Sequence, residues 1–155
     1  MTSTSVETEF TRVGTCFCGA SRVVTSGIPI AVSICHCSIC RTLSGAPFTA
    51  QALFKADRVK FEGDEPTTTS TSPQVNRCRC ARCSSPMYAS LMKGTMMAVP
   101  LSLINTPGSS DNLKPTHHMY YGHRVLDVDD DLPKFVKSKG ELWTPECDVA
   151  ANQSA

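Results

Sequence analysis

The feature that most constrains this chain is a group of three cysteines within six positions, Cys35, Cys37 and Cys40, which we call the cysteine trio. Thiolates at this C-x-C-x-x-C spacing can bind one soft metal ion together, and zinc is the ion that such a set indicates. Three ligands leave a tetrahedral ion one position short, and an open position distinguishes a catalytic zinc from a structural one. The rest of the chain therefore either closes this site with a fourth ligand or leaves it open for a substrate.

Nine cysteines in 155 residues indicate either a disulfide framework or a set of metal ligands. Residues 1–9 contain neither the basic start nor the apolar core of a secretion signal, and no apolar run approaches the length of a membrane span. The odd count also leaves at least one thiol out of any full set of disulfides. We therefore expect metal-binding cysteines in a cytoplasmic protein with no membrane partner.

Size and charge limit the remaining possibilities. The 15 basic and 14 acidic residues nearly balance, so the formal charge is +1 and no nucleic-acid partner is expected. A chain of 155 residues can bury a core of its own as one domain. Composition predicts a flexible N-terminal tail at residues 1–9, a single zinc-binding domain at 10–139 and a C-terminal tail at 140–155.

Hydrophobic alternation and turn residues predict a mostly β domain with short helical turns. Residues 38–43 fit a single helical turn, and the polar residues 64–72 fit a hairpin or loop. An acidic turn is expected at 129–135. Strands are expected at 21–26, 30–35, 48–54, 59–61, 87–91, 95–99 and 116–121.

Four further cysteines form a C-x-C pair, Cys16 and Cys18, and a C-x-x-C pair, Cys80 and Cys83. Residues two apart on an extended strand point to the same side, so the first pair can face one ion. Joining the two pairs gives a closed tetrahedral site of four thiolates, which is a structural zinc site. We call these residues the four-cysteine cluster.

The trio can still be closed by another side chain, which would make it a second structural site. The candidates for this fourth ligand are Cys78, His117, His118 and Cys147. Only one of the two adjacent histidines can face the site if they lie on a strand. His36 lies between two ligands, so we expect its ring to point away from the metal, with a role as proton carrier as the alternative.

The charge of an open trio indicates its substrate. Zinc with three thiolates has a formal charge of about −1, so it acidifies a bound water less than zinc with neutral ligands does. A thiolate from a small molecule suits such a site better than water. We expect a thiol substrate, with Arg41 as the first choice for binding its carboxylate and Lys55 or Arg77 as weaker ones.

Four segments of the chain resemble the glutathione-dependent formaldehyde-activating enzyme family, which also includes the centromere protein V type. They are G-T-C-F-C-G at 14–19, C-H-C-S-I-C-R-T-L-S-G-A-P-F at 35–48, C-A-R-C-S-S-P-M-Y at 80–88 and D-L-P-K-F at 131–135. Ser84 stands where the family pattern has Gly, a Trp common in the family is missing around 124–127, and Cys78 is extra.

The resemblance implies a tent-like, all-β zinc-binding fold with a structural zinc on the four-cysteine cluster and a catalytic zinc on the trio. It implies a carbon–sulfur lyase or synthase that acts on glutathione or a glutathione adduct, as in the formation of S-(hydroxymethyl)glutathione from formaldehyde. Two alternatives remain open. One is an enzyme of secondary metabolism with a different adduct or electrophile, and the other is a non-enzymatic zinc module that binds a partner protein through Arg77, Arg79 and Arg82.

Overall fold

The computed structural model describes residues 10–152, and side chains up to residue 148. The expected N-terminal tail at 1–9 lies outside the described residues. The described part is mainly β, with a few short helices, so the predicted fold class is confirmed. None of its helices is long and apolar enough to cross a membrane.

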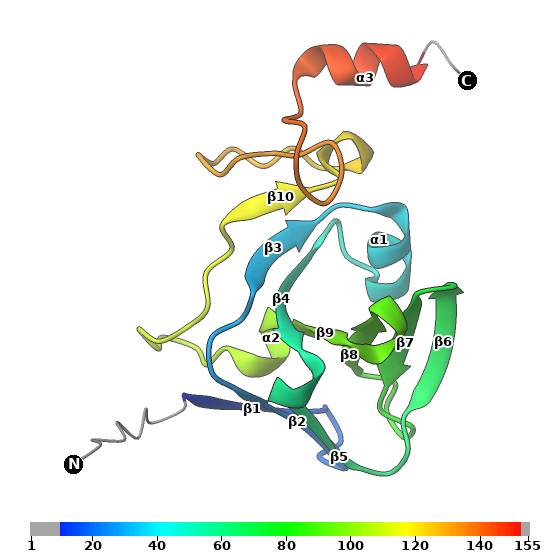
Figure 1. Ribbon diagram of the computed structural model, residues 1–155, viewed down its shortest axis with the longest axis vertical. Helices are drawn as coiled ribbons and strands as arrows, with labels where there is room; N and C mark the ends of the chain where they lie inside the picture. The colour runs from blue at the N-terminus through cyan, green and yellow to red at the C-terminus, as the bar shows by residue number, and fades with distance from the viewer. Residues whose placement is uncertain (1–9, 153–155) are drawn as a thin grey trace, which may run out of the picture.

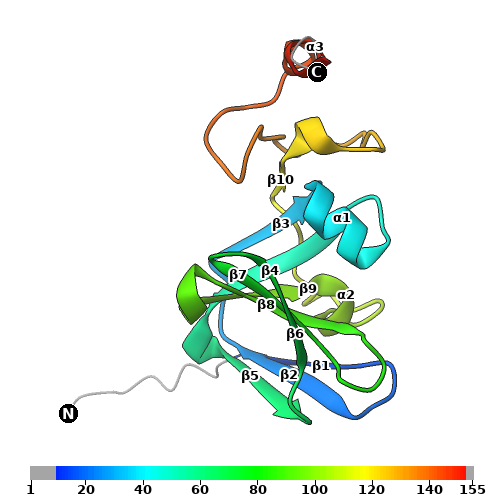
Figure 2. The ribbon, with the colours of Figure 1, turned by 90° about the vertical axis from the view of Figure 1, so that its right-hand side faces the viewer.

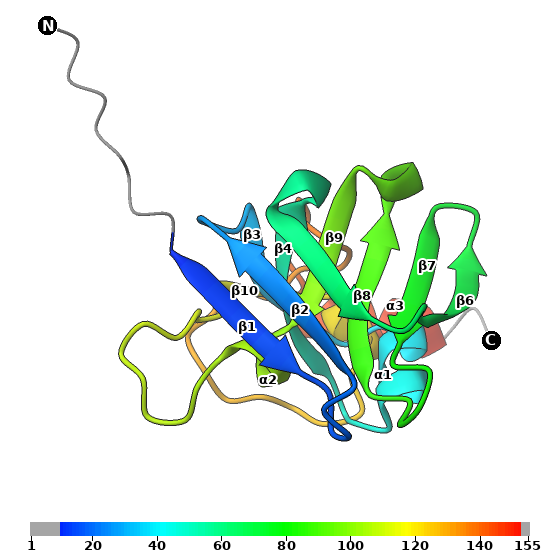
Figure 3. The ribbon, with the colours of Figure 1, turned by 90° about the horizontal axis from the view of Figure 1, so that it is seen from below.

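Three strands form a small antiparallel sheet in the order β1-β2-β5. They are β1 (Thr11–Thr15), β2 (Ser21–Ser26) and β5 (Val59–Gly63). In Figure 3, β1 and β2 lie in front of the larger sheet. Residues Cys16 to Ala20, which join β1 to β2, therefore form a turn at one end of this small sheet.

Seven strands form the second sheet in the order β10-β3-β4-β9-β8-β7-β6, shown in Figures 1 and 2. Their bounds are β3 (Ala31–Cys35), β4 (Thr49–Lys55), β6 (Thr67–Ser72), β7 (Val75–Arg79), β8 (Pro86–Leu91), β9 (Met96–Pro100) and β10 (His117–Met119). Neighbouring strands are antiparallel except β10, which runs parallel to β3 at the edge of the sheet. Parallel pairing requires a long crossover connection, and here residues 36–116 supply it.

The short helices lie at the ends of strands. The α-helices are α1 (Ser38–Ser44), α2 (Leu101–Ile104) and α3 (Pro145–Asn152), and the 3-10 turns are η1 (Ala56–Arg58), η2 (Met92–Gly94) and η3 (Tyr121–His123). The predicted helical turn at 38–43 corresponds to α1. No pattern predicted α2, because its four residues are too few to show a helical period.

The core lies between the two sheets and is closed at one side by α2. Val23 from β2 packs into a cluster with Phe54 from β4 and Val99 from β9, and all three are fully buried. Leu101 and Ile104 bring α2 into the same cluster. Burial of a large apolar side chain of this kind stabilises the fold by about 1.5–3 kcal/mol.

Several segments differ from the expected pattern, and β1 is one of them because no strand was predicted at 11–15. Residues 67–72 form strand β6 at the sheet edge, where Thr and Ser side chains are mostly exposed, so no apolar alternation marks them. Strand β7 was not predicted, because its polar sequence V-N-R-C-R shows no apolar face. Its inward side chains include Cys78, and Arg77 and Arg79 are half-buried.

The segment after residue 139, expected as a tail, contains α3 and packs on η3 through aromatic and charged groups. The Arg124 guanidinium lies 4.7 Å from the Tyr121 ring centroid and 4.4 Å from that of Trp143. Asp148 accepts hydrogen bonds from Arg124 and from Trp143 Nε1. These contacts hold α3 at the opposite end of the molecule from β1 and β2 (Figure 1).

Because β1 and α2 are in close contact at Gly14, we expect a larger residue there to destabilise the fold. A Cβ at this position would lie 2.5 Å from both Cγ and the carbonyl oxygen of Leu103, so β1 or α2 would have to shift. We expect Gly14→Ala to lower the free energy of unfolding by about 1–3 kcal/mol in a denaturant titration. Gly122→Ala is the control, because its Cβ would meet nothing closer than 3.8 Å. Equal stability of both variants would contradict this packing.

Candidate functional site

The cysteine trio lies where β3 ends and α1 begins. Cys35 is the last residue of β3, and Cys37 is the N-cap of α1 with an extended backbone conformation. The backbone N–H of Cys40 donates to Cys37 Sγ at 3.3 Å, so the sulfur takes the part that a Ser or Asp oxygen plays in an ordinary N-cap. Gly45 ends the helix in the left-handed region.

The three sulfur atoms lie within 4.8 Å of one another, close enough to bind one ion. Among the described residues, no fourth Cys, His, Asp or Glu joins them. The four candidates for closing the site have other neighbours. Cys78 lies 3.7 Å from Thr68 Oγ1, Cys147 is near Thr144, His117 is 3.0 Å from Thr116 Oγ1, and His118 contacts His36.

The four-cysteine cluster is built from two tight turns. The sulfur atoms of Cys16 and Cys18 are 3.6 Å apart, and Cys18 Sγ is 3.8 Å from Cys80 Sγ. Cys83 completes a group whose four sulfur atoms lie within 4.8 Å. Ser21 supports it by donating its backbone N–H to Cys16 and its hydroxyl to Cys80. The structure thus brings together the two pairs that spacing suggested.

Ser84, which follows this cluster, has a φ of 60° and lies in the left-handed region. Glycine adopts this conformation without strain, whereas a residue with a Cβ does so at a cost. This conformation is consistent with the Gly that the resemblance leads us to expect at this position. Ser84 is exposed, so its hydroxyl meets no steric obstacle.

The electrostatics of the trio favour a thiolate at Cys40. Hydrogen bonds from Cys35 and Cys37 lower the pKa of the Cys40 thiol, burial opposes this, and the nearby Arg77 charge lowers the pKa further. The pKa of Cys35 is raised by its hydrogen bonds to the other two sulfur atoms and by burial. Arg77 Nη2 donates to Cys40 Sγ at 3.5 Å. A cation thus already contacts the sulfur cluster.

Two buried histidines and one solvent-exposed aspartate form a hydrogen-bonded series beside the trio loop, and the sequence did not predict this series. His36 Nε2 is 2.9 Å from His118 Nδ1, and His118 Nε2 is 2.9 Å from a carboxylate oxygen of Asp130. Both imidazole rings are fully buried. Lys134 donates to Asp130 at 2.9 Å. Hydrogen bonds from Lys134 and His118 outweigh burial, so the pKa of Asp130 falls to about 2.

The hydrogen-bonded series His36–His118–Asp130 holds the loop that carries the trio in place. The His36 ring is not part of the group of converging sulfur atoms, and it packs edge-on against Tyr121. The backbone N–H of His36 also donates to the carbonyl of Met119 on β10. Burial, together with the positive charges around the ring, lowers the pKa of His36 to about 4. A neutral imidazole therefore lies between two cysteines of the trio in the sequence.

The segment 131–135 closes this arrangement from the other side. The backbone N–H of His118 donates to Pro133 O, and that of Phe135 donates to His118 O. The D-L-P-K-F sequence therefore keeps Asp130 and Lys134 beside the buried histidines. The sequence spacing did not predict the contact between β10 and residues 131–135, because it forms only when the folded chain brings these segments together.

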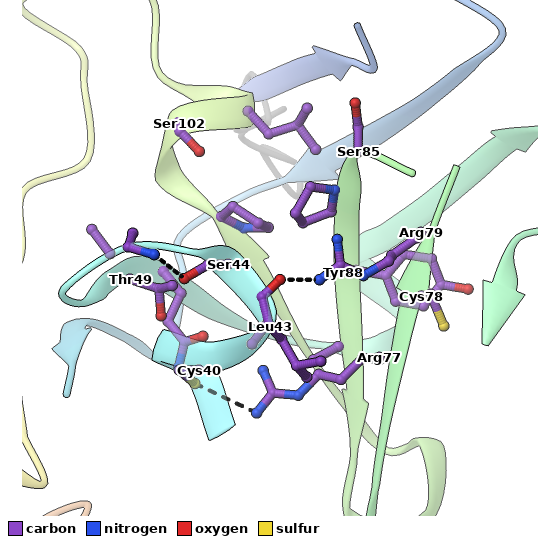
Figure 4. Close-up of a pocket in the computed structure, with 18 of the residues that line it drawn as sticks. Cys40, Leu43, Ser44, Thr49, Arg77, Cys78, Arg79, Ser85, Tyr88 and Ser102 are labelled. Atoms are coloured by element: carbon purple, nitrogen blue, oxygen red, sulfur yellow. Dashed lines mark hydrogen bonds between the residues drawn. The ribbon is translucent and has the colours of Figure 1, made fainter. Parts of the chain in front are cut away.

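A cavity of about 500 Å³ lies beside the trio and reaches the four-cysteine cluster (Figure 4). Cys40 and Arg77 border one part of it, and Cys16 and Ser85 border another. Cavities of this size hold small molecules in many proteins. Arg79 also lines the cavity, where it donates to the carbonyls of Leu43 and Ser84.

Arg41, the predicted substrate contact, lies on α1 next to the third cysteine of the trio. Its Nε donates to the carbonyl of His36 at 3.0 Å, so the side chain is held against the trio loop. Arg41 is not among the residues that line the cavity, whereas Arg77 is. Lys55 lies exposed at the far end of β4.

The sequence model of the family described as glutathione-dependent formaldehyde-activating enzyme matches residues 11–123, more than half of the chain. The chain belongs to this family. The matched region contains both cysteine groups, the cavity and His118, while Asp130 and α3 follow it.

Solved structures support the fold of this family member. A crystal structure of a Rhodobacter sphaeroides protein aligns with a TM-score of 0.52 at 15% sequence identity, covering 66% of this chain and 96% of that one. At this identity the likeness concerns the fold alone. A search of curated proteins gave no significant match.

The donor sets of both cysteine groups fit a thiophilic metal ion. All ligand atoms are sulfur, each group converges within 4.8 Å, and no carboxylate or imidazole is mixed in. Hard ions such as Mg²⁺ and Ca²⁺ prefer oxygen, so they do not fit these sites. The family member can therefore hold two soft metal ions, one in a closed set and one in an open set.

The hydrogen bond between buried His118 and Asp130 allows a test at Asp130. We expect Asp130→Ala to lower the free energy of unfolding by about 1–3 kcal/mol, because the buried Nε2 of His118 loses its partner. Denaturant titration of the metal-loaded protein measures this. Asp131→Ala is the control and should change stability by less than about 0.5 kcal/mol, because its exposed side chain has no such contact. An unchanged free energy of unfolding in Asp130→Ala would show that the contact does not hold the loop.

Proposed function

We propose that the protein is a zinc-dependent carbon–sulfur lyase or synthase that acts on glutathione or a glutathione adduct. The observation that carries the proposal is the open trio: three convergent thiolates with no fourth protein ligand among the described residues, next to a cavity. The family is described as glutathione-dependent and formaldehyde-activating, which supports a thiol as one substrate and a carbonyl compound as the other. We assign a structural zinc to the four-cysteine cluster and a catalytic zinc to the trio.

We assign a separate role in this reaction to each group of residues around the trio. Cys35, Cys37 and Cys40 would hold the zinc, which would supply a soft Lewis acid for a thiol in its nucleophilic thiolate form. The His36–His118–Asp130 chain holds the trio loop in one geometry. Arg41 uses its Nε to bind His36 O, and its two Nη nitrogens remain to bind a glutathione carboxylate beside the loop.

The reaction that we propose is addition of a thiol to a carbonyl carbon, and its reverse. The thiol sulfur forms a bond to the carbonyl carbon, the π-electron pair moves to oxygen, and the oxygen takes the proton that the thiol loses. No electrons are gained or lost overall, so no redox partner is needed. Metal–thiolate sites of this kind suit the reducing cytoplasm, where we place the protein.

The alternative of a purely structural zinc module depended on a fourth protein ligand at the trio. The described residues provide none, and a cavity borders the site instead. Of the three arginines suggested for partner binding, Arg77 and Arg79 line that cavity and Arg82 pairs with Asp64 at 2.8 Å. The geometry thus favours an enzyme over a binding module.

Replacing one trio ligand tests the function. We expect Cys37→Ser to lower the catalysed loss of a glutathione adduct by at least about 100-fold, because removing a ligand costs more than the 10–100-fold effect of altering groups around it. Turnover is followed by mass spectrometry with and without chelator. Cys147→Ser, which removes a thiol outside both groups, is the control. Full activity in Cys37→Ser with an intact fold would refute the proposal.

Metal content separates the two sites. We expect two zinc ions per chain in the wild type and one in Cys37→Ser, measured by elemental analysis together with circular dichroism. Cys80→Ser should unfold, because a structural zinc contributes about 10–16 kcal/mol, more than most domains have as total stability. A mild chelator should remove the trio metal first and stop turnover while the fold remains. Simultaneous loss of both ions and of the fold would contradict the assignment.

A further inference from the structure

The cavity is much larger than the carbonyl compound for which the family is named. Formaldehyde has two heavy atoms and would occupy about twice the 30 Å³ share of a water molecule. The cavity measures about 500 Å³ and has room for a ligand of drug-like size. Most of its volume would therefore remain unused by formaldehyde.

The wall of the cavity is suited to an apolar group. Ala89 and Ala98 face each other across β8 and β9 and are both buried, and Ala50 lies on the adjacent β4. Their small side chains leave the space open. Larger apolar residues complete the wall, among them Phe48 and Leu103. Transfer of an apolar group from water into such a space is favourable in proportion to the area buried.

Charge is confined to one part of the wall. Arg77 and Arg79 are the charged residues that line the cavity, and no acidic residue, lysine or histidine does so among the described residues. Arg79 already donates to two backbone carbonyls. Arg77 contacts Cys40 through Nη2, and its Nε is buried without a hydrogen-bond partner. A buried donor without a partner costs about 1–3 kcal/mol, and the protein leaves the Arg77 guanidinium incompletely hydrogen-bonded.

Glutathione itself does not suit this cavity. At neutral pH it carries two carboxylates and one ammonium group, and the wall offers no acidic side chain for the ammonium. Burying that charge without a partner would be costly. The peptide part of the thiol is therefore better placed outside, on the side of Arg41, with only its sulfur reaching the trio.

We propose that this cavity is the electrophile site, and that it takes an aldehyde with a bulky apolar body whose carbonyl oxygen is held by Arg77. This inference rests on the proposed thiol-addition reaction and names its second substrate. Arg77 contacts the sulfur cluster at Cys40, so a carbonyl carbon that approaches a thiol sulfur at the trio has its oxygen near the guanidinium (Figure 4). Arg77 is thereby a catalytic residue that binds the oxygen as it becomes negative.

The step balances without further reagents. The thiol sulfur attacks the aldehyde carbon, and the carbon–sulfur bond forms as the π pair moves to oxygen. Arg77 stabilises that charge until the oxygen takes the proton released by the thiol. The product is a hemithioacetal with the apolar body in the cavity. Cleavage follows the same path in reverse.

A series of aldehydes tests the size of the site in the wild-type, metal-loaded protein. Hemithioacetal formation from glutathione is followed by stopped-flow absorbance with formaldehyde, butanal, octanal and phenylacetaldehyde, each corrected for the spontaneous reaction. We expect kcat/KM to be at least about tenfold higher for octanal or phenylacetaldehyde than for formaldehyde, because a single methylene in an apolar pocket is worth about 10–200-fold. No acceleration with any aldehyde would refute the proposed function. Acceleration that is greatest with formaldehyde would leave the function standing and refute the electrophile site.

Two variants test which residues select the aldehyde. Ala98→Leu fills part of the cavity and should shift the kcat/KM ratio of octanal to formaldehyde at least tenfold toward formaldehyde. Arg77→Met should lower kcat about 100-fold with a smaller change in the KM for glutathione, and Arg77→Lys should restore part of the loss. Zinc content and circular dichroism are measured for each. An unchanged ratio in a folded Ala98→Leu would refute the cavity assignment. If the lower kcat of Arg77→Met is explained by a loss of bound zinc, the proposed role of Arg77 in binding the carbonyl oxygen is refuted.

Discussion

Four sulfur atoms from two distant turns must come within 4.8 Å of one another, and much of this architecture follows from that requirement. One turn joins β1 to β2 in the small sheet, and the other joins β7 to β8 in the large sheet. Bringing them together fixes the two sheets face to face, with Val23, Phe54 and Met87 buried between them. A link between the sheets at this point adds to the stability that the apolar core provides.

The cysteine trio and the four-cysteine cluster are connected by the cavity that both border. The trio lies at the far side of that cavity, on the loop between β3 and α1, and is positioned by contacts of another kind. Neutral, buried His36 has its ring against Tyr121 and its backbone bonded to β10. A closed site therefore organises the sheets, while a hydrogen-bonded chain of side chains organises the open site. The two groups share a ligand chemistry but differ in what holds them.

Ligand spacing and alternation predicted a good part of this structure. The residues of both cysteine groups, the helical turn after Cys37 and most strands could be derived locally, because each depends on neighbours two to four positions apart. Strands β6 and β7 could not, since their polar sequences lack a buried face that would reveal them. The contact of His118 with His36 in the trio loop joins residues 82 positions apart, and that of Arg77 with Cys40 joins residues 37 positions apart, so no local pattern relates them.

The parallel pairing of β10 with β3 has a consequence for synthesis of the chain. The four-cysteine cluster has all its ligands once residue 83 has left the ribosome, whereas the trio loop gains its partners only when residues 117–130 have followed. A nascent chain thus spends this interval with three closely spaced thiols on a loop that is not yet anchored. The trio loop is therefore the later of the two cysteine groups to gain its structural contacts.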